Sequence, residues 1–328
     1  MSDRKKSFRE IARTCGVSAA TVSRIANGIG RFTEDTYEKV TSALLAEGYT
    51  IQGMASEAPQ VIAAIVTDLS NELYNTVLSD LRRYLLRRNY LLQIYVEDDS
   101  QEDLFSKLLQ LHPAGIFMIG TPLQKIALSS LLPAVQVLSN SAVSYNGRCY
   151  AIWSDEYVGG QLAARELLSK GCRRPLILNN RHTAASESKR IHGFQHEMEQ
   201  AGIASSSIPI YDGEPHKSAF NSANDRIAYL CAKGTSFDSV FACSDWRAYG
   251  ALTALRKMGV TVPEDVKVIG FDGERVSRYC DLPFTTIQQN PDMIASAALS
   301  LLLELIQGNV PADPEVLVPV QVQKGLTV

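Results

Sequence analysis

The stretch SFREIARTCGVSAATVSRIANG, residues 7–28, decides how the chain begins its fold. Ser7 and Glu10 have the spacing of a capping box, which starts a helix by satisfying two backbone amides. Ser18 is a second N-cap, and Gly16 before it is free to adopt the positive φ of a tight turn. Two short helices joined by a glycine-containing turn form a helix-turn-helix motif, whose second helix enters the major groove of DNA.

A third helix is predicted from Glu34 to Glu47, because Thr33 is a good N-cap and Gly48 a good helix stop. Apolar residues recur at helical spacing in all three segments, which predicts one small three-helix core over residues 1–50. These residues are Phe8, Ile11, Ala12, Val17, Val22, Ile25, Val40, Ala43 and Leu44.

Charge is distributed unevenly along the chain. Residues 1–31 carry a net charge of +5, whereas the whole chain carries −3, so the remainder carries −8. A basic head on an acidic body indicates nucleic-acid contact by the head alone. The basic side chains are Arg4, Lys5, Lys6, Arg9, Arg13, Arg24 and Arg31, against Asp3 and Glu10.

The chain begins with polar and charged residues, which is unlike a secretory signal, and its most apolar run, residues 297–303, is too short to cross a bilayer. The six cysteines are scattered without a C-x-x-C pair. That pattern is typical of reduced thiols rather than of a disulfide framework or a zinc site, so we expect a cytoplasmic protein.

From Val61 onward, buried-type apolar runs alternate with amphipathic stretches, which predicts an α/β fold of doubly wound parallel sheets covered on both faces. The alternation occurs twice, so we expect two lobes with a cleft between them. The predicted strands are 61–67, 91–96, 115–119, 134–138, 150–153, 175–178, 239–242 and 267–271, and the predicted helices are 71–88, 101–111, 156–170, 188–201, 218–232, 246–258 and 291–307.

Polar residues follow the predicted strands, where parallel sheets bind their ligands. Carboxylates, amides, an arginine and a tryptophan around one cleft suit a polyhydroxylated ligand, although Asp and Asn at strand ends are also common helix caps and turn formers. These residues are Asp68, Asn71, Asp98, Asp99, Asn140, Trp153, Ser154, Asp155, Asn179, Asn180, Arg181, His182, Ser244, Asp245, Trp246 and Asp272.

The sequence shows no phosphate-binding glycine loop and no nucleophile elbow, which argues against a nucleotide-dependent enzyme or a serine hydrolase. His192 and His196 are four residues apart on a predicted helix, but Gly193 stands where a zincin has its glutamate. We therefore expect no enzyme, no cofactor and no bound metal.

The segment from Val17 to Arg24, with Asn27 and the helix from Lys39 to Gly48-Tyr49, resembles the headpiece of the lactose-repressor (LacI/GalR) family. The resemblance implies base reading at Ala19, Ala20 and Arg24, with Arg24 making most direct contacts and the Thr21 and Ser23 hydroxyls holding phosphates. The implied DNA-binding residues are Ser18, Ala19, Ala20, Thr21, Ser23, Arg24 and Asn27.

The body resembles the effector-binding core of the same family, which is shared with periplasmic sugar-binding proteins. The matching segments are 153–160, 186–194, 244–252, 270–272 and 283–287. The resemblance implies that Arg190 and Asp272 clasp vicinal hydroxyls of an effector, and the implied effector-binding set is Asn71, Tyr74, Asn140, Trp153, Arg190, Asp245 and Asp272. The implied first lobe is about 61–156 and 288–313, and the second about 157–287 and 314–328.

The linker at residues 51–60 departs from the family, which has Pro-Asn after the tyrosine and a hinge helix bearing a leucine. Here Ile51 and Gln52 replace the Pro-Asn pair, Ala58 replaces the leucine, and Pro59 follows. Because paired leucines wedge into the minor groove in the family, we predict that this hinge does not kink DNA in the usual way, unless Met54 or Ile51 takes the place of the leucine.

Together these features predict a DNA-binding transcriptional repressor whose operator affinity is controlled by a sugar or sugar derivative. Members of the family that this chain resembles form tetramers when they carry a leucine-heptad tail after the core, and this sequence shows no such heptads. We therefore expect a homodimer on a palindromic operator. Two alternatives remain: a purine- or nucleoside-responsive regulator of the same fold, and a sugar-binding protein with an impaired DNA-binding hinge.

Overall fold

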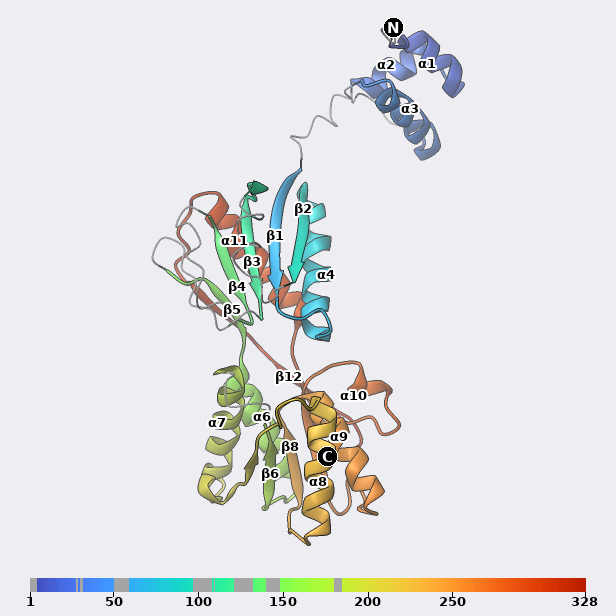
Figure 1. Ribbon diagram of the computed structural model, residues 1–328. Helices are drawn as coiled ribbons and strands as arrows, with labels where there is room; N and C mark the ends of the chain where they lie inside the picture. Colours follow the sequence, from blue (N-terminus) through green and yellow to red (C-terminus); the bar gives the residue numbers. More distant parts are fainter. Residues whose placement is uncertain are drawn as a thin grey trace. The chain divides into compact units, whose positions relative to one another are not determined.

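The computed structural model describes residues 5–27, 29, 32–49, 59–96, 108, 110–120, 132–139, 148–179 and 185–328. The chain divides into a first compact unit, Met1–Gln60, and a second, Val61–Val328, which are described separately (Figure 1). Several sequence expectations lie outside the described residues: most of the helix at 101–111, the hinge at 51–58, and Asp98, Asp99, Asn140, Asn180, Arg181 and His182. None of the helices described has the length and apolarity needed to cross a bilayer.

The first unit is the predicted three-helix head, made of α1 (Phe8–Cys15), α2 (Ala19–Ala26) and α3 (Glu34–Ala46). The capping box between Ser7 and Glu10 is present, and Gly16 ends α1 in the left-handed conformation at φ 70°. The inner faces of the helices share one apolar core, which confirms the helical spacing inferred from the sequence. Its buried residues are Ile11, Ala12, Val22, Ile25, Ala26, Val40 and Leu44.

The second unit contains two six-stranded sheets, each at the centre of one lobe. The α/β fold expected from the sequence is therefore confirmed. The elements in chain order are β1 (Gln60–Val66), α4 (Glu72–Leu86), β2 (Tyr90–Val96), β3 (Gly115–Ile119), β4 (Ala134–Val137), β5 (Ala151–Ser154), α6 (Glu156–Ser169), β6 (Pro175–Leu178), α7 (Ala185–Gln200), β7 (Ile210–Tyr211), α8 (Ala219–Ala232), β8 (Ser239–Ala242), α9 (Asp245–Lys257), β9 (Lys267–Asp272), α10 (Val276–Tyr279), β10 (Thr285–Gln288), α11 (Pro291–Ile306), β11 (Glu315–Val318) and β12 (Gln321–Gln323), with a short 3-10 helix at Ser205–Ser207.

The first lobe is built on the sheet β11-β5-β4-β3-β1-β2, whose assigned pairings β1–β3, β3–β4, β4–β5 and β5–β11 are all parallel. Helices α4 and α11 pack together on one face of this sheet (Figure 1). Alternate residues of β1 and β3 point to opposite faces, as the two-residue period of a strand requires. Ile62, Ala64 and Phe117 accordingly join the core under α4 and α11, whereas Ala63 and Ile65 join the other face.

The second lobe is built on the sheet β12-β10-β9-β8-β6-β7, in which only the pairing of β10 with β12 is antiparallel among the pairings assigned. Helices α8 and α9 cover one face and α6 and α7 the other (Figure 1). This doubly covered parallel sheet brings the carboxyl ends of β6, β8 and β9 to one edge, where a ligand site is expected.

The chain passes between the lobes three times, after β5, after β10 and after β11. The third crossing corrects the lobe boundary expected at residue 314. Strand β11 pairs with β5 through Glu315–Ala151 to Val318–Ser154, so it belongs to the first lobe, and only β12 and the residues after it join the second. Both strands are short and partly exposed, so their apolar pattern is too weak to predict them from sequence.

Candidate functional site

Helix α2 begins at Ser18, whose side-chain oxygen accepts a hydrogen bond of 3.0 Å from the backbone amide of Thr21. The two hydroxyls of these residues also lie 2.9 Å apart. At the other end of the helix, the Asn27 amide donates to the backbone oxygen of Ser23 at 2.7 Å. The predicted DNA-binding polar groups at the two ends of α2 are therefore held by local hydrogen bonds.

One face of α2 is open to solvent. Ala20, Arg24 and Asn27 are exposed and are spaced four and three residues apart, which places them in one row along the helix. Ala19 is half-buried, and the guanidinium of Arg24 lies 5.7 Å from the centre of the Phe32 ring. A row of one small side chain, one arginine and one amide can enter a major groove and offer a bidentate donor to guanine.

Arg190 is at the centre of the candidate ligand site in the second unit. Its guanidinium donates to both oxygens of Glu156, with Nη2 2.8 Å from Oε1, and to the backbone oxygen of Cys243 at 2.6 Å. The guanidinium also lies 3.1 Å from Oδ1 of Asp272 and 3.8 Å from the centre of the Phe271 ring. A buried arginine held between two carboxylates and an aromatic face has its guanidinium fixed in one position and orientation.

Asp272 ends β9 and has an uncommon backbone conformation for a residue other than glycine, with φ 120°. The Gln289 amide donates to its Oδ1 at 2.8 Å, and Ser154 of the first lobe donates to Gln289 at 2.5 Å. This chain of contacts joins the lobes. Burial raises the pKa of Asp272 to about 6, although the nearby Arg190 opposes the shift.

Asp245 lies deeper than a ligand contact would. It is fully buried, and its two oxygens accept from the Thr286 hydroxyl at 2.5 Å and from the backbone amide of Glu274 at 2.7 Å. Burial, with the negative charge of Asp272, raises the pKa of Asp245 well above its usual range. Its geometry is that of a side chain that fixes the loop after β9.

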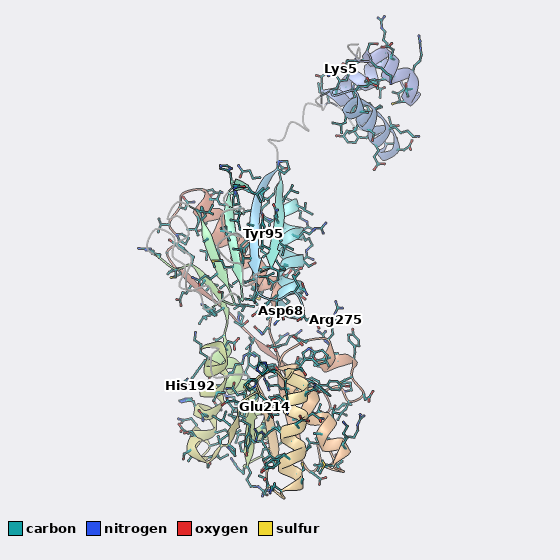
Figure 2. All side chains as sticks on the ribbon, viewed as in Figure 1. Lys5, Asp68, Tyr95, His192, Glu214 and Arg275 are labelled. Atoms are coloured by element: carbon teal, nitrogen blue, oxygen red, sulfur yellow. The ribbon has the colours of Figure 1, made fainter. Side chains whose placement is uncertain are left out.

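A cavity of about 180 Å³ lies where the lobes meet, between the first turn of α4 and the loop after β9. Glu72 of the first lobe accepts hydrogen bonds from the backbone amide of Arg275 in the second, at 3.1 and 3.2 Å. Figure 2 shows Arg275 and Asp68, which come from different lobes, both in the region where the lobes meet. The cavity is lined by Glu72, Leu73, Thr76, Asp272, Gly273, Glu274, Arg275, Arg278, Gln288, Gln289 and Pro291.

Of the other predicted effector residues, Asn71, Tyr74 and Trp153 lie in the first lobe. Asn71 caps α4 by accepting from the Tyr74 amide at 3.1 Å, and the Tyr74 ring packs against the core and closely over Gly120. Trp153 is half-buried, and the ammonium group of Lys189 lies 5.3 Å from its ring centre. Asn140 lies outside the described residues.

The structure thus brings Arg190, Asp245 and Asp272 together and adds three residues that sequence reasoning missed as site members. These are Glu156, Glu274 and Gln289. Glu156 follows a predicted strand and lies in the first turn of a predicted helix. That position was the only sequence signal for it, and a glutamate in a first helical turn is ordinarily a surface residue.

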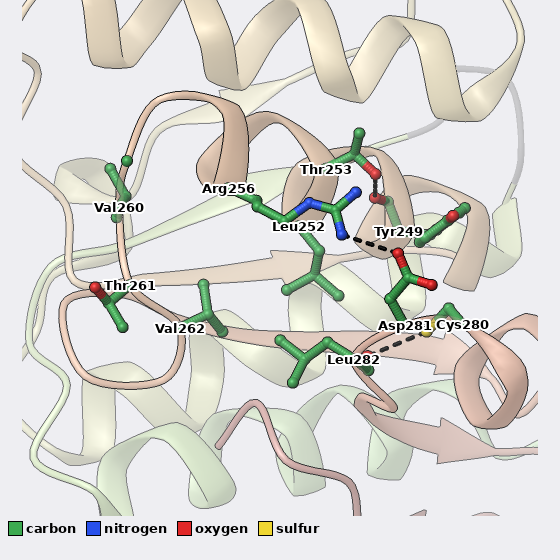
Figure 3. A pocket seen from close by; sticks show the side chains of 11 residues that line it. Tyr249, Leu252, Thr253, Arg256, Val260, Thr261, Val262, Cys280, Asp281 and Leu282 are labelled. Carbon is green, nitrogen blue, oxygen red and sulfur yellow. Dashed lines mark hydrogen bonds and ion pairs between the residues drawn. The ribbon is translucent and has the colours of Figure 1, made fainter.

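A second, larger cavity of about 390 Å³ lies elsewhere in the second lobe, between the end of α9 and the loops at 259–262 and 280–282 (Figure 3). Its wall is mainly apolar, with Leu252, Val260 and Leu282 prominent, and the ion pair Arg256–Asp281 at 2.9 Å lies in it. It shares no lining residue with the cavity between the lobes.

Two family models match the chain. Residues 7–51 match the model described as bacterial regulatory proteins, lacI family, and residues 164–328 match the periplasmic binding protein-like domain. Together they cover the head with its first linker residue and the larger part of the second unit, in the order that the two units have along the chain.

Curated relatives match over nearly the whole chain. The regulator GalS of Salmonella typhimurium is 29% identical over 90% of this chain and 89% of its own length. The repressor PurR of Vibrio vulnificus is 28% identical over 92% of each, and GalR of Escherichia coli is 26% identical over 91% and 88%. All three are named as transcriptional regulators or repressors, not as enzymes.

Solved structures share the fold. The lac repressor dimer bound to operator and an anti-inducer superposes with a TM-score of 0.74 at 22% identity over 99% of each chain. A LacI-family regulator from Enterococcus faecium with bound ribose has a TM-score of 0.72 at 21% identity over 82% of this chain and 98% of its own. The helix-turn-helix head, the two-lobed core and these matches agree, and the chain belongs to the LacI family of DNA-binding transcriptional regulators.

Proposed function

We propose that this chain represses transcription as a homodimer on a palindromic operator, and that a small polyhydroxylated molecule bound between the lobes controls its affinity for DNA. The observation that carries the proposal is the pair Arg190–Asp272, with 3.1 Å between guanidinium and carboxylate, at the carboxyl end of β9 beside a cavity between two lobes. Paired planar polar groups bind vicinal hydroxyls, and ligands of parallel sheets bind at this edge.

DNA contact is assigned to α2. Arg24 makes the main base contact and Ala20 a methyl contact, whereas Thr21, Ser23 and the amides near Ser18 hold phosphates. Ala19 and Asn27 complete the interface. A homodimer presents two such helices to two half-sites, which fits the lac repressor structure described as a dimer bound to operator.

A sugar is the favoured effector class. Structures of the same fold are described with bound ribose and with cellobiose. Within this chain, Arg190 and Asp272 are the proposed hydroxyl contacts, and Trp153 and Asn71 belong to the proposed first-lobe wall. Asp245 and Tyr74 are given positioning roles, because one is fully buried and the other packs against the core.

Control follows from closure of the cleft. A ligand changes DNA affinity only by as much as it binds the two conformations differently. Contacts that join the lobes, such as Ser154–Gln289 and Glu72–Arg275, are the ones that a ligand in the cleft would strengthen or replace. The position of the head relative to the core then responds to the state of the cleft.

The test has two stages. Selection from a pool of random duplexes should enrich a palindrome whose binding weakens steeply with salt, because phosphate contacts release counterions. A thermal-shift screen of sugars, sugar phosphates, purines and nucleosides should then show stabilisation by a sugar, at about 2.7 kcal/mol for a ligand at 100 times its Kd. Asp272→Asn should abolish that shift, and exposed Asp313→Asn should keep it.

Failure to enrich any duplex would contradict the regulatory proposal. Stabilisation only by purines or nucleosides would replace the sugar with that class. Thermal stabilisation by a sugar that persists in Asp272→Asn would show that the ligand does not bind at the Arg190–Asp272 site.

A further inference from the structure

Charged side chains of both signs line the cavity between the lobes. Three carboxylates line it: Glu72 from α4, and Asp272 and Glu274 from the end of β9 and the loop that follows. Two guanidinium groups, from Arg275 and Arg278, line it as well. An acidic cluster alone has many explanations, so the state of each charged group decides what the cavity can bind.

Glu274 is the group whose state is unusual. Its side chain is buried, with 9% of the residue exposed, and its Oε2 atom has no hydrogen-bond partner among the residues that the structure describes. The Trp246 indole N–H is its side-chain donor. A buried carboxyl oxygen without a donor is costly, and such groups in native proteins call for an explanation such as a ligand.

The surrounding charges do not stabilise the ionised form of Glu274. Burial, followed by the negative charges of Asp272 and Glu72, raises its pKa to about 8, whereas Arg190 lowers it only in part. The donors of Arg190 are directed to Glu156, to Asp272 and to the backbone oxygen of Cys243.

The two arginines of the cavity wall are also directed elsewhere. The Arg275 side chain is 79% exposed and lies 3.5 Å from Glu72, and Arg278 donates to the backbone oxygen of Gly273 at 3.3 Å. Neither makes an ion pair with Glu274 within the described part of the chain. The cavity wall therefore includes one carboxyl group, that of Glu274, whose Oε2 lacks a donor among the described residues, beside two carboxylates that already lie next to arginines.

We propose that the effector carries a protonated amino group, which binds against Glu274 and between Glu72 and Asp272, so that the ligand is an amino sugar or a similar hydroxylated amine. This inference rests on the proposed function, because it names the class of ligand for the same site. The amine binds against the carboxyl group of Glu274, while the hydroxyls of the ligand contact Asp272, which is paired with Arg190. An ammonium group beside Glu274 balances the charge that this carboxyl group gains when it ionises, and such electrostatic complementarity favours specificity.

The size of the cavity agrees with a small ligand. About 180 Å³ is below the range of roughly 300–1,000 Å³ that is common for drug-sized ligands. A single sugar ring with one amino group matches this space better than an oligosaccharide.

Ligand binding also changes the protonation state of Glu274. At pH 6.5 the carboxyl group of Glu274 is mostly protonated in the empty site, since its pKa is about 8. An ammonium group beside it favours the ionised form, so the site releases a proton when the ligand binds. Neutral sugars do not drive this release.

The experiment is calorimetry on the full-length chain at pH 6.5. The probes are glucosamine, galactosamine, mannosamine and 6-amino-6-deoxyglucose, each compared with its neutral parent and with its N-acetyl form. We expect at least one amine to bind tenfold or more tightly than both its neutral parent sugar and its N-acetyl form. Its binding enthalpy should depend on the ionisation enthalpy of the buffer. Glu274→Gln should remove both the preference and the buffer dependence, and exposed Glu264→Gln should keep both.

The outcomes separate the two proposals. A neutral sugar that binds as tightly as its amine, or more tightly, overturns the amino-group inference and leaves the proposed function standing. Equal preference for the amine in wild type and Glu274→Gln overturns the role of Glu274. Binding of none of these compounds, together with a hit among purines or nucleosides, overturns the sugar class as well.

Discussion

The guanidinium of Arg190 and the carboxylate of Asp272 lie 3.1 Å apart, so the two residues expected to hold a ligand also hold each other. Glu156 binds the same guanidinium from the start of α6. All three side chains are largely buried. Arg190 therefore holds two buried carboxylates together, and through Asp272 it is linked to the wall of the cavity between the lobes.

The first prediction concerns the stability contributed by this pair. Arg190→Ala leaves Glu156 and Asp272 buried without their cation, so we expect a loss of about 3–5 kcal/mol in the free energy of unfolding. Arg165, whose pair with Glu197 is half exposed, is the control, and Arg165→Ala should cost less than about 1 kcal/mol. Chemical denaturation measures both, and similar losses for the two variants would contradict the triad as a structural element.

The second prediction concerns pH. The pKa of Glu274 is raised from 4.5 to about 8, so the folded protein binds a proton that the unfolded chain has lost between these values. Stability due to this group is therefore full below pH 4.5 and falls as the pH rises towards 8, by about 5 kcal/mol over the window. Glu274→Gln removes this dependence and should be the more stable protein at pH 8.5.

Denaturation of the two proteins at steps from pH 5 to pH 8.5 tests this. The difference between the curves isolates Glu274, because Asp272, whose pKa is raised to about 6, titrates in both proteins. Parallel curves would contradict the buried, protonatable state of Glu274.

The third prediction concerns the contact between α6 and α7. A Cβ atom on Gly160 would lie 2.0 Å from the backbone oxygen of Arg190, and one on Gly193 would lie 2.0 Å from that of Tyr157. Gly160→Ala must separate the helices, so we expect a loss of about 1–3 kcal/mol and weaker ligand binding, since the backbone of Arg190 shifts. Ser169→Ala, at the exposed end of α6, should change neither, and an unchanged Gly160→Ala variant would contradict the close packing.

The fourth prediction concerns base reading. Arg24 is exposed on α2, and its replacement by alanine should weaken binding to the selected duplex by about 5–150-fold per half-site, since a bidentate contact contributes about 1–3 kcal/mol of discrimination. The preference for one base position should relax at the same time. Fluorescence anisotropy measures this, with exposed Lys257→Ala as the control. A uniform loss across all sequences would instead assign Arg24 to a phosphate.

Fold prediction from the sequence succeeded where local signals are strong. Strands β3, β6 and β8 were predicted with their observed bounds, because each is a fully buried apolar run between polar turns. The caps at Ser7 and Ser18 were also correct, because a cap depends only on residues within one turn. Strands β7, β11 and β12 were missed, because they have two to four residues and are partly exposed. Strand β10 was missed as well, because only one of its four residues is apolar.

The candidate site was predictable only in part. Asp272 and Arg190 could be named from their segments, but the roles of Glu156 and Glu274 depend on distances between α6, α7 and the loop after β9. Gln289 follows β10, which was not among the predicted strands, and its contact with Asp272 exists only because β10 pairs with β9. Such tertiary relationships leave no periodic signal in one sequence.

The central claim is that the cleft and the DNA-binding head are thermodynamically coupled, and its most direct test is reciprocal linkage. The Kd for the selected palindrome should be measured with and without saturating ligand, and the Kd for the ligand with and without saturating DNA. We predict the same factor in both directions, about 5–150-fold, because coupling free energy is reciprocal. If the ligand binds the Arg190–Asp272 cleft and leaves the Kd for DNA unchanged, the proposed control of transcription by this site is wrong.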